Sequence, residues 1–589
     1  MSARAVYKGI SVCPGVAIGE LWVLDGGAAN PPKLRVGDAR VEPEIQRFAE
    51  AIGSAQETLE QARTSLHEAH GEIYGQLVDA QLLMYGDSLL REGVESKIRD
   101  LRMCAEWAVR ATIDELKAPL LSADSRYFRE RAEDIELVGR QILRELGGDA
   151  IRLPPQDAEV IVVASVLSPA DAAALRDSAV LAIATESGSA TSHTAILART
   201  LGLPAVVAAH GIAHRAEVKN IAIVDAIRGE VVIEPDEAER EDAERRAERY
   251  RQYSLGLKAR RDAPVVTLDG HPVEIYANVE LSFEVDRVLS QRAHGVGLFR
   301  TEFLYLNRAK PPTEAEQLEV YRRTIERLDG RPITFRTFDL GADKMPRFER
   351  GIPKPSVSFG RTGLRYALTA RDLFRTQLRA LLQAAKFGAV SVMFPAVAGV
   401  DDLKAALQLL DEVREELKRE GIEFGEPPIG SMIELPSAAL RSHRLAEYSD
   451  FFSVGTNDLI QHALAVDRND PFATGYATSL DPAVLDLLQM SVASASARGI
   501  PISICGDMAS DPVALPLVLG LGLSQLSAPI AMVPMVQETV RRVTLEDCKA
   551  LVGEAMAAPS ASAVRALVRE AFSEQLGELW AEQGAFGER

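Results

Sequence analysis

A regular alternation of strand-like and helix-like segments constrains the second half of the chain. Beyond residue 262, amphipathic stretches such as "DDLKAALQLLDEVREELKRE" separate most of a series of short apolar runs. Eight such runs occur: "VEIYANV", "GVGLFRT", "ITFRTFDL", "AVSVMFPAV", "PIGSMIEL", "FFSVGTND", "PISICGD" and "QLSAPIAMV". This alternation is typical of parallel strands joined by crossover helices. Eight repeats over about 285 residues predict a (β/α)8 TIM barrel, a fold of about 250 residues.

The first half of the chain has a different pattern. Strand-like runs occupy residues 1 to about 30 and return between 158 and 235, while the intervening segment carries apolar residues at helical spacing. We therefore expect a multidomain α/β chain with an α/β domain at 1–35 and 149–235 and an inserted helical subdomain at 36–148. Residues 236–262 are charge-dense and predict a solvated linker helix, a candidate hinge. The barrel would span 263–545, with further helices at 546–589.

Composition and charge narrow the functional class. The 589 residues are 47% hydrophobic and 26% charged, without an apolar run long enough to cross a bilayer or a secretory signal at the start. We expect a cytoplasmic protein with no membrane insertion. The four cysteines are too scattered for a disulfide framework or zinc site, and a net charge of −19 disfavours nucleic acid as a partner. An anionic substrate would need a few local arginines.

Polar residues gather at the carboxyl ends of the predicted barrel strands, where barrel enzymes build their sites. They are Asn278, Arg300, Glu302, Arg336, Asp339, Glu434, Asn457, Asp458 and Cys505. Arg300 and Arg336 come from neighbouring strands, and Arg468 follows the sixth. Converging guanidinium groups suit a small dianion or trianion, whereas a single arginine would suggest a surface salt bridge.

Two further features suggest chemistry at this end of the barrel. Glu434 and Asp458 end neighbouring predicted strands, and a pair of carboxylates without a nearby histidine or thiol suits Mg2+ completed by a substrate phosphate. The alternative is a strand-end cap paired to arginine. Cys505 is by default a small buried hydrophobic residue, but its position also allows a thiol to exchange a proton with a substrate carbon.

His193 lies outside the barrel, in "SGSATSHTAILART". Thr191 and Ser192 are good helix caps, so the pattern predicts a helix that begins at this point. The positive helix end would favour a neutral imidazole and an added anion, leaving a ring nitrogen free to attack phosphorus. A zinc site is disfavoured because no second strong ligand follows at helical spacing. By spacing alone a buried packing histidine remains the favoured alternative.

Several segments together resemble the family of phosphoenolpyruvate-utilising enzymes. "ATSHTAILARTLGLPAVV" is similar to their phosphohistidine signature, and "GVGLFRTEFLY", "GSMIELPSA", "FFSVGTNDLIQHALAVDRND" and "ISICGDMA" are similar to their barrel signatures. The order of the parts and the length resemble the Enzyme I branch, the phosphoenolpyruvate-protein phosphotransferases of the bacterial phosphotransferase system.

The resemblance implies a function. His193 would take the phosphoryl group from phosphoenolpyruvate and pass it to a histidine of the phosphocarrier protein HPr, the first step of sugar uptake. Cys505 would protonate the enolate carbon to give pyruvate. Substrate contacts would be Arg300, Arg336, Asn457, Asp458 and Arg468, and Glu434 with Asp458 would bind Mg2+. The α/β domain would be the family's swivelling phosphohistidine domain, the helical insertion would dock the carrier, and the barrel would form a homodimer.

Other assignments remain open. A nitrogen-type regulatory paralogue that phosphorylates an HPr-like carrier is the main alternative. A dikinase or synthase of the same superfamily is disfavoured, because it would need a large ATP-binding domain and the residues before His193 hold a helical block and no glycine-rich phosphate loop. The intact histidine, thiol, arginines and carboxylates argue against a non-catalytic scaffold.

The sequence also departs from the family pattern at four positions. Ala190 precedes "TSH" where a basic residue is usual, and Thr362, flanked by Arg361 and Arg365, replaces an arginine. Ala342 interrupts a usual double glycine, and Asp507 shortens a common glutamate.

Overall fold

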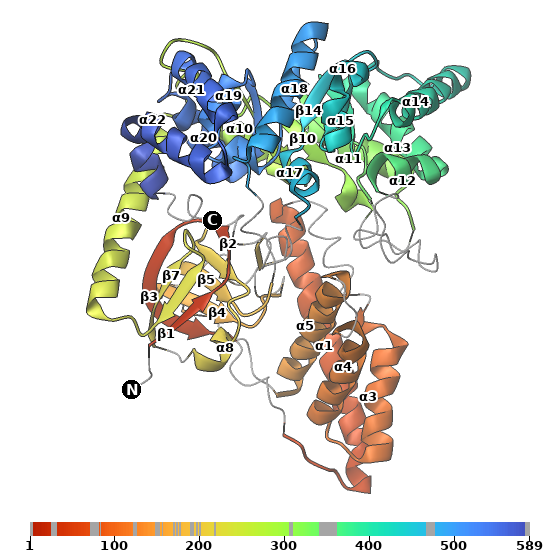
Figure 1. Ribbon diagram of the computed structural model, residues 1–589. Coiled ribbons are helices and arrows are strands. Elements are labelled where there is room, and N and C mark those ends of the chain that lie inside the picture. The colour runs from red at the N-terminus through yellow and green to blue at the C-terminus, as the bar shows by residue number, and fades with distance from the viewer. Residues whose placement is uncertain are drawn as a thin grey trace. The chain divides into compact units, whose positions relative to one another are not determined.

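The structure is a computed structural model of the chain. It describes residues 4–24, 32–70, 82, 84–121, 126–147, 154–155, 157–168, 171, 175, 178–188, 194–195, 198, 202–216, 219–305, 310–340, 362–466 and 478–582. The chain forms two compact units, Met1–Tyr253 and Ser254–Arg589, which are considered separately below (Figure 1).

The first unit combines a mixed sheet with a helical segment inserted into it. Its strands are β1 (Ala5–Lys8), β2 (Ile10–Cys13), β3 (Val16–Val23), β4 (Val160–Ala164), β5 (Val180–Thr185), β6 (Ala205–Val207), β7 (Ile221–Asp225) and β8 (Glu230–Ile233). Its helices are α1 (Val41–His70), α3 (Ser88–Leu101), α4 (Ala105–Leu121), α5 (Arg126–Gly147), α8 (Ile212–Arg215) and the start of α9 (Glu237–Ala259). The strand order is β1-β8-β7-β3-β4-β5-β6-β2. Strands from both sides of the helical insertion thus belong to one sheet, as predicted.

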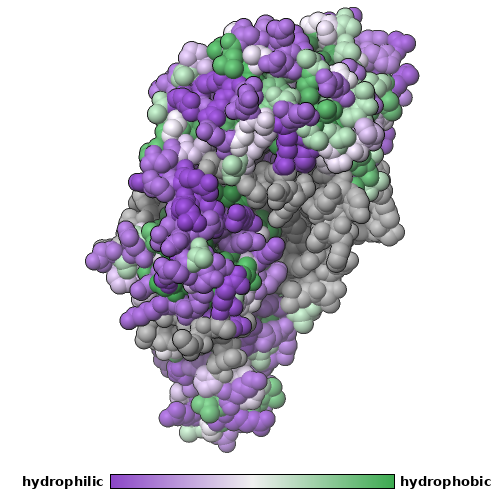
Figure 2. Space-filling model, turned by 60° about the vertical axis from the view of Figure 1, so that its left-hand side comes forward, coloured by the Kyte–Doolittle hydropathy of each residue, from purple (hydrophilic) through white to green (hydrophobic). Residues whose placement is uncertain are grey.

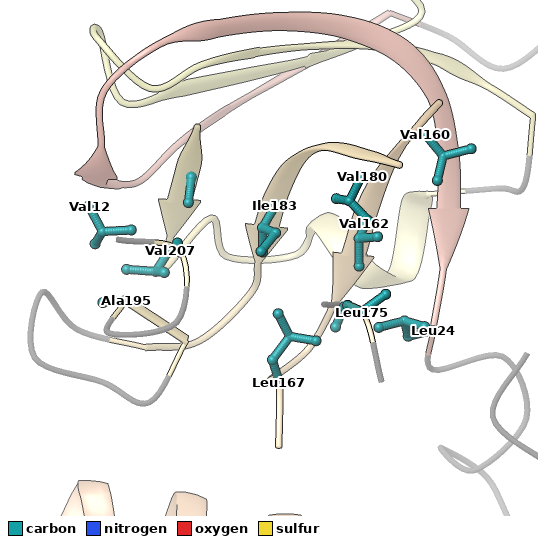
Figure 3. Close-up of a cluster of buried hydrophobic side chains, with 13 residues drawn as sticks. Val12, Leu24, Val160, Val162, Leu167, Leu175, Val180, Ile183, Ala195 and Val207 are labelled. Atoms are coloured by element: carbon teal, nitrogen blue, oxygen red, sulfur yellow. The ribbon is translucent and has the colours of Figure 1, made fainter. Parts of the chain in front are cut away.

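Strands β3, β4, β5 and β6 pair in parallel, and their side chains bury one face of the sheet in a single apolar cluster (Figure 3). Val162 and Ile183 are fully buried there. Ala195 and Ala198 join the same cluster from the segment that follows β5, where Thr194 and Ala195 are helical. The two described alanines of this segment therefore pack against the sheet.

The second unit is a closed barrel of eight strands that all pair in parallel. The strands are β9 (Glu274–Val279), β10 (Val296–Arg300), β11 (Ile333–Arg336), β12 (Val390–Phe394), β13 (Ile429–Ile433), β14 (Phe451–Val454), β15 (Ile502–Ile504) and β16 (Gln525–Pro529). Each coincides with one of the eight predicted runs. The predicted TIM barrel is confirmed.

Helices surround the barrel strands in Figure 1. They are α10 (Val285–Ser290), α11 (Glu314–Arg327), α12 (Gly363–Thr369), α13 (Arg371–Ala384), α14 (Val400–Glu420), α15 (Pro436–Leu440), α16 (Ser442–Leu445), α17 (Thr456–Leu464), α18 (Pro482–Arg498), α19 (Leu515–Gly520), α20 (Val533–Val540), α21 (Leu545–Ala557) and α22 (Ala561–Glu582). Helix α14 illustrates the sequence pattern: its buried residues Leu403, Ala406, Leu410 and Leu417 recur at helical spacing, and Gly421 ends the helix at φ 70°.

Helix α9 spans the boundary between the two units. It matches the predicted charge-dense linker helix, and Ala243 is one of its few buried residues. The side of the molecule on which α9 lies in Figure 1 is turned forward in Figure 2, where hydrophilic side chains predominate around the middle of the view. Among the described residues, no helix is both long enough and apolar enough to span a membrane.

Candidate active site

The carboxyl end of the barrel carries the polar residues that the sequence placed there. Arg300 and Arg336 are the last residues of β10 and β11 and lie opposite each other in the strand pairing. Glu434 directly follows β13, and Cys505 directly follows β15. Asn457 and Asp458 lie in the first turn of α17, just after β14. The barrel topology therefore brings these side chains to one rim.

Arg336 is a buried cation among carboxylates. Its Nη2 donates to Glu302 Oε1 at 3.0 Å and lies 3.4 Å from Asp339 Oδ2. Burial lowers the pKa of Arg336, but the charges of Glu302, Asp339, Glu434 and Asp458 raise it, and the net direction is upward. Glu302 also accepts the backbone N–H of Asp339 at 2.7 Å, which fixes the carboxylate that holds the guanidinium.

Both rim arginines, Arg300 and Arg336, carry a buried Nε donor without a partner in the described part of the chain. Arg300 Nη1 donates to Glu280 Oε1 at 2.6 Å. A buried guanidinium donor without an acceptor costs free energy. Two guanidinium groups that end neighbouring strands at one rim fit a small anion.

The carboxylates near these arginines fit a hard cation. Burial, Asp458 and Asp339 raise the pKa of Glu434 well above its ordinary value, which means that the ionised form lacks sufficient positive charge around it. One Glu434 oxygen accepts the backbone N–H of Ala396. No cluster of three or more histidine, cysteine or acidic side chains suited to a metal occurs among the described residues. Two oxygen ligands suit Mg2+, which keeps several waters and takes substrate phosphate oxygens.

Cys505 is almost fully buried, and Leu298, Met393 and Met432 surround it. Burial raises the pKa of its thiol to about 11. The residue lies close enough to Glu434, Arg336 and Arg300 for their charges to act on the thiol. A thiol that keeps its proton near neutral pH beside an anion site can act as an acid.

The segment after Cys505 packs closely against the start of α17. Asn457 Oδ1 accepts the backbone N–H of Asp507 at 2.8 Å. A Cβ atom on Gly506 would overlap Thr456 Oγ1 and would come within 2.9 Å of Asn457 Oδ1. The "GTND" and "CGD" motifs therefore contact each other directly, and glycine is required there because of space, since its φ of −83° is ordinary.

The structure describes only some of the other positions that the sequence analysis named. His193, Arg468, Ala190, Arg361 and Ala342 lie outside the described residues. Thr362 is the cap residue of α12, and Arg365 on that helix pairs with Asp402 at 2.9 Å on the surface. Asp507 is exposed.

The sequence alone does not show that several residues pair with the site arginines or hold the Cys505 backbone. Glu280 pairs with Arg300, while Glu302 and Asp339 pair with Arg336. A signal existed for the last two, because "RTEF" and "RTFD" each place an acidic residue two or three positions after an arginine. Asn278 was noted only as a strand-end residue, and its amide donates to the Cys505 carbonyl at 3.0 Å.

Comparison with known proteins identifies the family. The chain matches three family descriptions: "PEP-utilising enzyme, N-terminal" over residues 8–131, "PEP-utilising enzyme, mobile domain" over 156–229, and "PEP-utilising enzyme, PEP-binding domain" over 255–545. PEP denotes phosphoenolpyruvate. The three matches follow the order in which the sequence resemblance placed the parts.

Curated relatives cover nearly the whole chain. Phosphoenolpyruvate-protein phosphotransferases from Bacillus sp. (strain S) and Bacillus subtilis are 35% and 34% identical over 96% of this chain and cover 98% and 99% of their own lengths. The protein of that name from Haemophilus influenzae is 33% identical over 96% of this chain and 99% of its own length. The chain belongs to the PEP-utilising enzyme family and aligns from end to end with members named phosphoenolpyruvate-protein phosphotransferase.

Proposed function

We propose that the chain transfers the phosphoryl group of phosphoenolpyruvate to His193, releases pyruvate, and passes the phosphoryl group to a histidine of the phosphocarrier protein HPr. This would be the first step of sugar uptake by a phosphotransferase system. The observation that carries the proposal is the single rim on which an anion site and a protonated thiol meet, in a chain whose relatives bear this activity in their names.

Arg300 and Arg336 bind the substrate anion in this proposal. They end neighbouring strands at the same rim, and phosphate or carboxylate oxygens of phosphoenolpyruvate supply acceptors for their guanidinium groups. Arg468 and Asn457 contribute further contacts. Phosphoryl transfer through a loose transition state depends on positioned positive charge more than on covalent chemistry, and buried guanidinium groups provide it.

Glu434 and Asp458 hold Mg2+ in this proposal. When bound, the ion neutralises charge on the phosphoryl oxygens. Burial first, and then Asp458 and Asp339, raise the pKa of Glu434, so a cation at this rim would favour its ionised form. Asp458 also lies among the proposed substrate contacts.

Cys505 completes the chemistry on the carbon side. When the bond between phosphorus and the enol oxygen breaks, His193 takes the phosphoryl group and the electron pair stays on the enolate. The methylene carbon of that enolate takes the Cys505 proton, which gives pyruvate, and the thiolate regains a proton from water. The raised pKa keeps the thiol protonated until an acceptor arrives.

The domain assignment follows from these roles. The α/β domain, 1–35 and 149–235, carries His193, and the helical insertion at 36–148 docks the carrier. The barrel at 263–545 binds phosphoenolpyruvate and forms the homodimer, the helices at 546–589 complete that unit, and the linker at 236–262 lets His193 reach both donor and carrier. We place the protein in the cytoplasm, where its substrate and carrier occur.

The direct test is incubation of the full chain with phosphoenolpyruvate labelled in its phosphate group, together with Mg2+. We expect an acid-labile, base-stable label on the parent chain and none on His193→Ala. Absence of label on the parent, or equal labelling of the alanine variant, would refute the proposal. Omission of Mg2+ with a chelator should abolish labelling, and Glu434→Gln should raise the Mg2+ concentration required.

The carrier is identified in a second step. The labelled chain is mixed with HPr or with a nitrogen-type regulatory carrier, and release of label from His193 is followed over time. Faster transfer to HPr supports the sugar-uptake role, and faster transfer to the regulatory carrier assigns the chain to the regulatory branch.

A further inference from the structure

A buried glutamine lies behind the two strand ends that carry the substrate arginines. Gln377 belongs to α13, between the apolar residues Phe374, Leu378 and Leu381, and its side chain is inaccessible to solvent. An amide at a core-facing helix position is costly unless each polar atom finds a partner. The hydrogen-bond partners of the Gln377 side chain therefore indicate what this residue does.

Those partners belong to both arginine-bearing strands. Gln377 Nε2 donates to Thr301 Oγ1 at 2.9 Å, and Gln377 Oε1 accepts the backbone N–H of Phe338 at 3.0 Å. Thr301 Oγ1 in turn donates to the carbonyl oxygen of Arg336 at 2.9 Å. One side-chain amide thus connects the residue after Arg300 with the residue two positions after Arg336.

The connection occurs where sheet hydrogen bonding between these strands stops. The described pairing of β10 with β11 ends at Arg300 and Arg336. Beyond this pair, the Thr301 hydroxyl donates to the carbonyl oxygen of Arg336, and the side-chain oxygen of Gln377 accepts the backbone N–H of Phe338. Side chains therefore replace the ladder at the point from which both guanidinium groups project.

The glutamine is itself held on its far side. Its Nε2 also contacts the hydroxyl of Tyr321 at 3.3 Å, and that hydroxyl donates to Gln317 Oε1 at 3.2 Å. Tyr305 donates to the same Gln317 oxygen at 2.9 Å. All these side chains are fully buried. A fully satisfied buried network of this kind has one arrangement and is rigid.

We propose that Gln377, acting through Thr301, is a positioning residue that sets the spacing of the Arg300 and Arg336 guanidinium groups for one substrate anion. The inference rests on the proposed function, because it assigns the two arginines to phosphoenolpyruvate. Displacement of about 1 Å at a reacting group can cost about a hundredfold in rate, so a rigid support has a direct catalytic effect.

The test compares Gln377→Leu with a matched control in the full chain. Leucine fills the space but can form a hydrogen bond with neither Thr301 nor the Phe338 N–H. Gln383→Leu is the control, since Gln383 lies on the same helix, is also buried, and within the described part of the chain donates only to Glu314 and the Arg379 carbonyl. Pyruvate release is measured against phosphoenolpyruvate concentration, with thermal unfolding recorded for each variant.

We expect Gln377→Leu to raise KM for phosphoenolpyruvate and to lower kcat/KM at least about tenfold. Gln383→Leu should keep both constants even where its melting temperature falls equally. If Gln377→Leu does not fold, Thr301→Val gives the same comparison, because valine keeps the shape and removes the hydroxyl, while Thr301→Ser should recover most of the loss. The double variant of Gln377→Leu and Thr301→Val should show a fold-decrease in kcat/KM smaller than the product of the fold-decreases in the two single variants.

The outcomes separate the two proposals. A parent chain that neither binds phosphoenolpyruvate nor is labelled by it would refute both. Normal labelling of the parent, with parental KM and kcat/KM in Gln377→Leu and Thr301→Val, would refute this inference alone. Equal kinetic losses in Gln377→Leu and Gln383→Leu would show a general packing effect and would also overturn it.

Discussion

Arg336 and Glu302 form a buried ion pair whose partners each depend on the other. Glu302 is 4% exposed and accepts from both Arg336 and the Asp339 backbone. Removing one member of a buried pair costs about 3–5 kcal/mol because the other charge is left uncompensated. We expect Glu302→Ala to lower the free energy of unfolding in this range and to raise KM for phosphoenolpyruvate.

Urea unfolding and substrate titration check this expectation. Glu302→Gln keeps an oxygen acceptor for the Asp339 N–H and should lose less stability than the alanine variant. Glu326→Ala is the control, because Glu326 pairs with Arg322 on the surface and exposed pairs contribute little. Equal effects of Glu302→Ala and Glu326→Ala would contradict the buried-pair interpretation.

Cys505 yields a prediction about the order of the chemical steps. Replacing it with alanine removes the proton donor, and general acid catalysis typically contributes about 10²–10⁴-fold. We expect Cys505→Ala to slow pyruvate formation within that range while His193 stays the labelled residue. Rapid-quench measurement of label and pyruvate in one turnover separates the two events. Unchanged pyruvate formation would remove the assigned role.

The raised pKa of Cys505 fixes the direction of its pH dependence. The folded thiol keeps its proton up to about pH 11, whereas an unfolded cysteine loses it near 8.5. Its contribution to stability is therefore complete below about 8.5 and falls as pH rises toward 11. Urea titrations from pH 7 to 10 should show a decline in the parent that is smaller in Cys505→Ala.

At the scale of elements, the sequence predicted strands better than contacts. All eight barrel strands could be placed because a short apolar run recurs with each repeat, and six of these runs carry a polar residue or Cys505 at or near the end. The residues at those ends could be named for the same reason. Their partners could not, because Glu280 meets Arg300, and Gln377 meets Thr301 and the Phe338 N–H, only after the chain folds.

The spacing of residues in the sequence also could not assign a role to Cys505, because the chemistry of its thiol depends on burial. The raised pKa of Cys505 arises from Leu298, Met393 and Met432, which come from three other strands. No local pattern around "SICGD" contains that information. The position of His193 relative to any partner remains a prediction, since it lies outside the described residues.

The contact between Cys505's strand end and α17 can be tested through Gly506. A Cβ at this position would overlap Thr456 Oγ1 and crowd the Asn457 side chain. We expect Gly506→Ala to displace the first turn of α17 and to weaken phosphoenolpyruvate binding at least about tenfold. Isothermal titration measures the affinity of each variant.

The control for this substitution is another glycine. Gly553 lies within α21, and a Cβ there would meet nothing within 4 Å. Gly553→Ala should stabilise the chain by about 0.5–1 kcal/mol, because alanine favours helix, and should leave affinity unchanged. Parental affinity in Gly506→Ala would show that the start of α17 tolerates displacement.

At the scale of the whole molecule, α9 is attached to each unit by a separate set of contacts. Arg246 on α9 pairs with the buried Asp225 of the first unit, and Arg4 pairs with Glu239. Arg260, just after α9, pairs with the buried Glu538 of the second unit at 2.9 Å. Because the two sets share no residue, a substitution that removes the contacts in one unit leaves the contacts in the other unit intact.

This separation predicts two thermal transitions in the full chain, one for each unit. Asp225→Ala should lower only one, and Glu538→Ala only the other, by roughly 5 °C or more. Each variant removes a buried carboxylate worth about 3–5 kcal/mol, and about 1 kcal/mol corresponds to about 2–4 °C in units of this size.

Adding phosphoenolpyruvate and Mg2+ shows which thermal transition belongs to which unit. The His193→Ala variant is used so that the substrate is not turned over. At about 100 times its Kd, a ligand that binds only the folded state adds about 2.7 kcal/mol. We expect differential scanning calorimetry to show that substrate raises the transition lowered by Glu538→Ala and leaves unmoved the one lowered by Asp225→Ala. A single cooperative transition, or a substrate shift of both, would mean that α9 couples the two units into one folding unit and transmits substrate binding from the barrel to the α/β sheet.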